Sequence, residues 1–140
     1  MIKELRELCD KYKDTEFSQD LTLILLDCQI MPLTEKIKKL VMDICLVSEC
    51  SIQELLRSRK TKPKYYRFCL VYLLCLRGYD LTHVGQMITE PFGLKLYDHS
   101  SVMHGRDEVS FMLKYNKDII GKTLEQVRGL FKVYFGDVNV

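Results

Sequence analysis

Residues Lys64–Gly78, KYYRFCLVYLLCLRG, decide the fold of this chain. Apolar residues run without a break from Phe68 to Leu76, so a helix built from them has no face that suits water. Pro63 stands just before this stretch and Gly78 ends it, at positions where helices commonly begin and end. We therefore expect a buried helix from Lys64 to about Arg77.

The same apolar run is too short to cross a membrane. It has nine residues, whereas a spanning helix needs about 20. The N-terminal sequence, MIKELRELCDKYKD, is charged throughout and lacks the apolar core of a signal peptide. These two features predict a cytoplasmic protein without a membrane partner.

Helical periodicity continues on the N-terminal side of this helix. Three further helices are expected, over residues 1–13, from about residue 15 to residue 30, and over residues 33–48. Ser51 and Glu54 have the spacing of a capping box, which predicts a short helix after them. We assign residues 1–31 to an N-terminal helical extension and residues 32–140 to one helical domain.

The C-terminal side of the chain is equally helical, with helices expected over residues 81–89, about 98–114, and after residue 116. The residues placed to cap or end these helices are Asp80, Pro91, Gly93, Asp98 or Ser100, and Asn116. The residues that recur on one face of the last two helices are Val102, Arg106, Val109, Leu113, Ile120, Leu124, Val127, Phe131 and Tyr134. No run with a period of two residues occurs, so the expected fold class is all-α, a helical bundle.

Composition agrees with a single folded domain. The chain has 140 residues, of which 47% are apolar and 29% charged, a balance that excludes wholesale disorder. Gly and Pro are scarce, at 7 and 3 residues, which argues against a turn-rich β architecture.

Cysteines and histidines give no strong sign of a metal site. The six cysteines, at positions 9, 28, 45, 50, 69 and 75, form no CxxC pair, and we interpret them as reduced thiols of the core. His99 and His104 are five residues apart and His83 lies on the preceding helix, but no cysteine is near enough in sequence to complete a zinc site. No metal and no cofactor are expected.

Net charge conceals a strongly basic segment. The chain carries 21 Lys and Arg against 19 Asp and Glu, a formal charge of +2. Residues 57–67, RSRKTKPKYYR, hold six cations and no acid, which leaves −4 on the other 129 residues. A focused cationic segment on a mildly acidic body attracts phosphate, although a solvated loop is the plain alternative. The cations are Arg57, Arg59, Lys60, Lys62, Lys64 and Arg67.

Two of the expected helices, about 80–89 and 98–114, are joined in the manner of a helix-turn-helix. Such a motif presents the first residues of its second helix to the major groove of DNA. Here these residues are Asp98, His99, Ser100 and Ser101, whose side chains can form hydrogen bonds to base edges or phosphates.

Four segments follow one another in a recognisable order. They are LLRSRK at 55–60, LTHVG at 81–85, FG at 92–93 and DHSSVMHG at 98–105. With this order, residues 34–135 resemble the C-terminal DNA-binding domain (domain IV) of the bacterial chromosomal replication initiator DnaA family, a TrpR-like helix-turn-helix domain. That family's domain binds double-stranded DNA, with a basic loop in the minor groove and a signature helix in the major groove.

The resemblance implies roles for particular residues. Arg57 or Arg59 would enter the minor groove, and the start of the signature helix would contact bases and backbone. It also implies sequence-specific binding linked to replication initiation or its regulation. The candidate DNA-binding residues are Arg57, Arg59, Lys60, Lys62, Lys64, Asp98, His99, Ser100, Ser101 and His104.

Three departures from the family pattern lie beside the base-reading residues. Extra residues separate Gly85 from Asp98, Tyr97 stands where the family has arginine, and serines replace both threonines of the signature. The family's own recognition sequence therefore does not carry over. The chain also lacks the GxxxxGK[ST] motif of an ATPase domain, so we expect no ATPase activity.

Several single residues have plainer interpretations. His104 is either packed against its neighbours or in contact with a phosphate. Of Tyr65 and Tyr66, we expect one in the core and one partly exposed. Met103 and Met112 are expected to fill the core.

No enzymatic activity is expected. Asp107 and Glu108 point to different faces of a helix, so they make a poor acid–base pair. Ser100 and Ser101 lack the strand–turn context of a nucleophile elbow.

An alternative function is a helical protein–protein interaction module, a replication or mobile-element accessory that keeps the fold without binding DNA. It could bind a replication protein, or itself through residues 1–31. The motivation is the apolar content of residues 86–97, which would block the base-reading edge if they covered it. The apolar residues concerned are Pro91, Phe92, Leu94 and Leu96.

Overall fold

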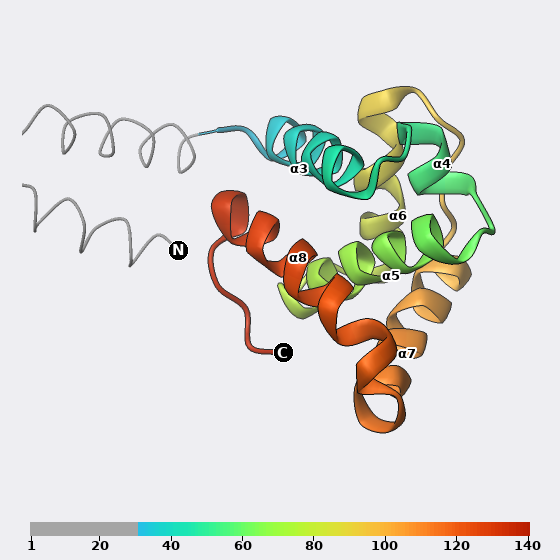
Figure 1. Ribbon diagram of the computed structural model, residues 1–140. Helices are drawn as coiled ribbons and strands as arrows, with labels where there is room; N and C mark the ends of the chain where they lie inside the picture. Colours follow the sequence, from blue (N-terminus) through green and yellow to red (C-terminus); the bar gives the residue numbers. More distant parts are fainter. Residues whose placement is uncertain (1–30) are drawn as a thin grey trace, which may run out of the picture.

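The computed structural model describes residues 31–140, so the helical extension expected over residues 1–31 lies, apart from residue 31, outside the described residues. Within the described part the chain is an all-α bundle without strands, which confirms the predicted fold class (Figure 1). None of its helices combines the length and the apolar character that a membrane span requires. The elements are α3 (Leu33–Ser48), α4 (Ile52–Arg57), α5 (Thr61–Leu76), α6 (Leu81–Thr89), the 3-10 helix η1 (Glu90–Phe92), α7 (His99–Tyr115) and α8 (Lys117–Phe135).

Helix α5 is the centre of the bundle. Nine consecutive residues, Tyr66–Leu74, are buried, and α5 contacts each of the other five α-helices of residues 31–140 (Figure 1). The sequence prediction that this helix begins at Lys64 is wrong by one turn, because it begins at Thr61. Pro63 lies within the first turn, where the missing N–H of proline leaves no hydrogen bond unmade.

Helices α3 and α8 each bury one face. The predicted stripe of α3 is buried from Ile37 to Ser48, whereas Leu33 at its first turn is half-exposed. In α8, Phe135 occupies the last core position in place of the predicted Tyr134. The Tyr134 hydroxyl instead donates to Asp43 Oδ2 at 2.6 Å, so the polar ring stays at the edge of the core.

Most predicted helix caps are present. The Glu54 N–H donates to Ser51 Oγ at 3.1 Å, and the Ser51 N–H donates to Glu54 Oε1 at 3.1 Å, which completes the capping box. Asp80 and Asp98 each accept from the backbone N–H three residues further on, at 2.9 Å. Asn116 precedes α8 as predicted, but its side chain makes no capping hydrogen bond.

The core-facing side of α7 is rotated relative to the prediction. Arg106 and Leu113 are only half-buried. A Cβ built on Gly105 would lie 2.8 Å from Phe68 Cδ1, so glycine at this position lets α5 and α7 pack closely. The buried residues of α7 are Val102, Gly105, Val109 and Met112.

The two methionines of α7 have different environments. Met112 is buried, as predicted. Met103 is 41% exposed, so the prediction that it fills the core is wrong. The reason is the rotation of α7, which turns the side of Gly105 toward α5 and leaves Met103 on the outward side.

Helices α6 and α7 are brought together at Gly85. A Cβ built there would lie 1.7 Å from the backbone oxygen of Tyr97, so only glycine fits at this point. Because Tyr97 directly precedes the N-cap Asp98, this close approach fixes where α7 begins.

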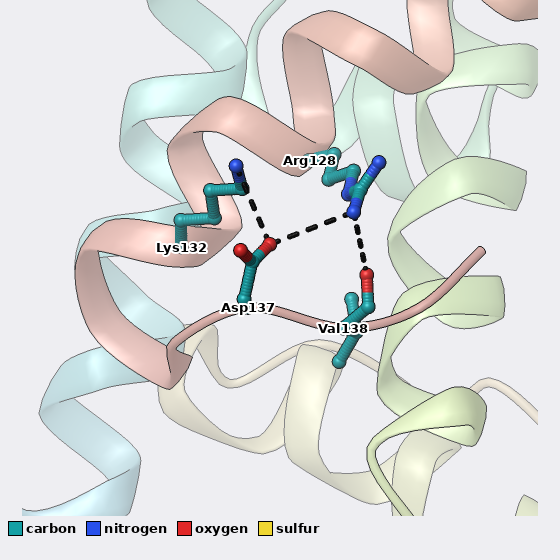
Figure 2. A network of polar contacts seen from close by, with 4 residues as sticks. All are labelled: Arg128, Lys132, Asp137 and Val138. Atoms are coloured by element: carbon teal, nitrogen blue, oxygen red, sulfur yellow. Dashed lines mark hydrogen bonds and ion pairs between the residues drawn. The ribbon is translucent and has the colours of Figure 1, made fainter. Parts of the chain in front are cut away.

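After α8 the chain folds back along the helix. Arg128 Nη2 donates to the Val138 carbonyl oxygen at 2.9 Å and lies 3.5 Å from Asp137 Oδ1 (Figure 2). Lys132 Nζ lies 3.3 Å from the same carboxylate oxygen. These contacts hold Val138 in a buried position against the core.

Replacing Gly85 with alanine should lower the free energy of unfolding by about 3 kcal/mol, because the new methyl group overlaps the Tyr97 carbonyl oxygen. Gly129→Ala is a matched control, since nothing lies within 4 Å of a Cβ built there. That variant should raise the free energy of unfolding by about 0.5–1 kcal/mol through helix propensity. Urea unfolding followed by circular dichroism measures both, and equal stabilities would contradict the close approach.

Candidate nucleic-acid interface

A groove of about 620 Å³ opens between the α4–α5 loop and the first turns of α5 and α7. In Figure 1 this loop and the start of α7 lie on the same side of the bundle. The groove is lined by seven of the ten residues predicted to bind DNA, namely Arg57, Arg59, Lys64, Asp98, Ser100, Ser101 and His104. Lys60, Lys62 and His99 are exposed but do not line it.

Arg67 connects the two walls of this groove, which are the α4–α5 loop on one side and the start of α7 on the other. Its Nη1 donates to the carbonyl oxygens of Leu55 and Ser58, both at 2.9 Å. Its Nε donates to the hydroxyl of Tyr97 at 3.3 Å, and its guanidinium lies 5.7 Å from the centre of that ring. Arg67 is only 6% exposed. Its inclusion among six phosphate-facing cations is therefore wrong, and five cations of the segment remain.

Tyr97 holds the start of α7 against the basic loop. It is buried, and it stands where the resemblance leads one to expect an arginine. Its hydroxyl meets Arg67 and its backbone oxygen lies against Gly85, so two elements fix the residue that precedes Asp98.

The five remaining cations differ in exposure. Arg59, Lys60 and Lys62 are exposed, whereas Arg57 and Lys64 are half-buried. The Nη2 atom of Arg57 is buried and finds no hydrogen-bond acceptor in residues 31–140. A buried donor without an acceptor is costly, so an anionic oxygen entering the groove would stabilise it.

The first turn of α7 is open to solvent. Asp98, His99 and Ser100 are exposed, and Ser101 is half-buried. The hydrogen bond from the Ser101 backbone N–H holds the pKa of the Asp98 carboxyl below its usual range, so this group is ionised at neutral pH. The turn thus presents one carboxylate, one imidazole and two hydroxyls.

The segment between α6 and α7 does not cover this turn. Phe92 and Leu94 pack against the core, and Leu96 lies beside the groove with 52% of its surface exposed. Residues 86–97 therefore leave the first turn of α7 open.

His104 both packs and faces the groove. Its ring lies edge-on to Phe68, with 5.6 Å between the ring centres, and its side chain remains exposed. Of the two tyrosines, Tyr66 is buried and donates to Gln126 Oε1 at 2.6 Å, while Tyr65 is half-buried. The prediction of one core tyrosine and one partly exposed tyrosine is confirmed.

The described cysteines are free thiols. Cys69 is buried, and Cys45, Cys50 and Cys75 are partly buried. Burial raises the pKa of Cys69 to about 12 and, as the largest cause, that of Cys45 to about 11, so both stay protonated at neutral pH. Within residues 31–140 no three His, Cys, Asp or Glu side chains are grouped to hold a metal ion. Cys9 and Cys28 lie outside the described residues.

Sequence reasoning missed the part that Arg67 and Tyr97 play in building this groove. A signal for Arg67 was available, because it stands between Tyr66 and Phe68 in a helix that is apolar on all sides. Its acceptors come from residues 9, 12 and 30 positions away in sequence, and no local pattern specifies them.

No protein-family model, no curated protein and no solved structure matches the chain.

Replacing Arg67 with leucine should lower the free energy of unfolding by about 3 kcal/mol, because the Leu55 and Ser58 carbonyls would lose a charged donor. Arg77→Leu is the control, since Arg77 follows the same helix and is exposed. It should change stability by less than about 0.5 kcal/mol. Urea denaturation measures both, and similar midpoints would mean that Arg67 does not hold the walls together.

Proposed function

We propose that this chain binds double-stranded DNA sequence-specifically, through a helix-turn-helix formed by α6 and α7 and through the basic loop between α4 and α5. The observation that carries the proposal is the convergence of two distant segments on one groove. Arg57 ends α4, Arg59 lies in the loop and Lys64 is in the first turn of α5. Ser100 and His104 come from α7.

The two walls supply the two kinds of contact that DNA recognition needs. Cations such as Arg59 and Lys60 neutralise phosphates and release counterions, which gives affinity without regard to sequence. The exposed polar side chains at the start of α7, His99 and Ser100, can form hydrogen bonds to base edges in the major groove. The buried Nη2 of Arg57 offers a further donor for an acceptor on the nucleic acid.

Rigid placement of the walls favours binding. Because Arg67 ties the loop to Tyr97, the cations and the first turn of α7 are already arranged before DNA arrives. Less ordering entropy is then lost on association than with a flexible basic tail.

The wider role that we propose is a cytoplasmic one in replication initiation or its regulation, without ATPase or other enzymatic activity. Support comes from the resemblance of residues 98–105 to the signature of the initiator family. The interaction-module alternative requires residues 86–97 to cover the start of α7, and these residues leave Asp98, His99 and Ser100 exposed.

Neutralising two loop cations should weaken binding to every duplex. If about four phosphates are contacted, the logarithm of the binding constant should fall with the logarithm of salt at a slope near −3.6. Arg59→Gln/Lys60→Gln removes two contacts and should bring the slope to about −1.8. Fluorescence anisotropy with a labelled duplex, repeated over a salt series, measures this change.

Lys114→Gln/Lys117→Gln is the matched control for that experiment. It removes the same charge from two exposed lysines, Lys114 in the last turn of α7 and Lys117 at the start of α8, which lie at the far end of a helix about 24 Å long. Its salt slope should stay near the original value. An equal flattening by both pairs would show that overall charge, and not the groove, drives binding.

Replacing Ser100 or His99 with alanine should instead reduce discrimination between sequences. Each lost base contact should reduce the preference for the selected duplex over random competitor by about 1–3 kcal/mol and leave the salt slope unchanged. Competition binding against a random-sequence duplex pool measures the preference. A uniform loss of affinity on all sequences would assign these residues to the phosphate backbone.

A further inference from the structure

Met103 is an apolar side chain on a polar surface. It is 41% exposed, although its neighbours Val102 and Gly105 are buried. Among the exposed side chains in the first two turns of α7, Met103 is apolar and the others are polar. The others are His99, Ser100 and His104.

The helical repeat fixes the position of Met103 relative to the proposed base-reading residues. Met103 follows His99 by four residues and Ser100 by three, so it lies beside both on the helix surface. The buried residues Val102 and Val109 lie on the other side of α7. Met103 therefore lies one turn further along the same exposed surface of α7 that carries His99 and Ser100.

The next residue on the same edge limits how far this surface can reach into DNA. Asp107 is exposed and carries a carboxylate, 3.0 Å from Arg106 Nε. An acid at this point favours an approach in which α7 enters the groove with its first turns only. Met103 is then the last position before the helix leaves the bases.

The chemistry of the major groove offers Met103 one apolar partner. On base-pair edges that partner is the C5-methyl group of thymine. Ser100 and Ser101 carry no methyl group that could pack against it. A methionine thioether is flexible and polarisable, which suits it to such a small apolar surface.

Resting on the proposed function, we infer that Met103 is a specificity-determining residue that packs against a thymine methyl group next to the bases contacted by Ser100. The contact would add a preference for thymine that the hydroxyls of the first turn do not provide.

The test begins with selection of a preferred duplex from a random-sequence pool with the full chain. Each thymine of the selected duplex is then replaced singly by uracil, which removes only the C5-methyl group. At one position the wild-type dissociation constant should rise about fourfold, the ratio expected for one buried methyl group. In Met103→Ala and Met103→Gln, thymine and uracil at that position should bind equally well.

Controls separate this inference from the function on which it rests. Phe111→Ala removes another exposed apolar side chain of α7, two turns further on, and should keep the fourfold preference. If no sequence is enriched in the selection, the proposed sequence-specific function fails. If a sequence is enriched but no thymine methyl matters, or if Met103→Ala keeps the preference, the assignment of Met103 is overturned while DNA binding stands.

Discussion

The guanidinium of Arg67 is the interaction on which the candidate site depends. A buried cation is costly unless its donors are satisfied, and here two carbonyl oxygens and a tyrosine hydroxyl accept from it. The carbonyls belong to Leu55 and Ser58, at the end of α4 and in the loop that follows, while the hydroxyl belongs to Tyr97 before α7. The charge in the core therefore requires the loop and the start of α7 to remain side by side. If the two walls separated, an unpaired cation would be left in an apolar helix.

A second constraint acts on the same tyrosine from the opposite direction. Gly85 of α6 lets the Tyr97 backbone come closer than any side chain would allow, and Arg67 holds the ring. With both its backbone and its hydroxyl fixed, Tyr97 determines the position of Asp98 and so the direction of the first turn of α7. The relation between α6 and α7 thus depends on α5 as well as on the segment between them.

Local patterns in the sequence were sufficient for the helices and most of their caps. The capping box at Ser51 and the aspartates before α6 and α7 depend on residues within one turn of each other, and the apolar run of α5 is continuous in sequence. These local patterns did not predict the surroundings of Arg67, which was assigned to the phosphate-facing cations, or of Met103, which was assigned to the core. The partners of Arg67 are distant in sequence, and the exposure of Met103 follows from a rotation that Gly105 permits. The partners of Arg67 and the exposure of Met103 both depend on how the helices pack against each other. Periodicity within one helix does not predict that packing.

The groove is also a place where stability alone does not explain the residues present. Leu56 and Tyr97 make part of its lining apolar, and an aliphatic residue at position 57 would pack there without a polar atom to satisfy. The chain instead has Arg57, whose buried Nη2 lacks an acceptor in residues 31–140, an arrangement that costs about 1–3 kcal/mol. Asp98 lines the same groove, but it makes no hydrogen bond to this atom. An anionic oxygen in the groove would accept from this donor and remove the cost. The phosphate-bearing ligand that we propose for the groove would supply such an acceptor.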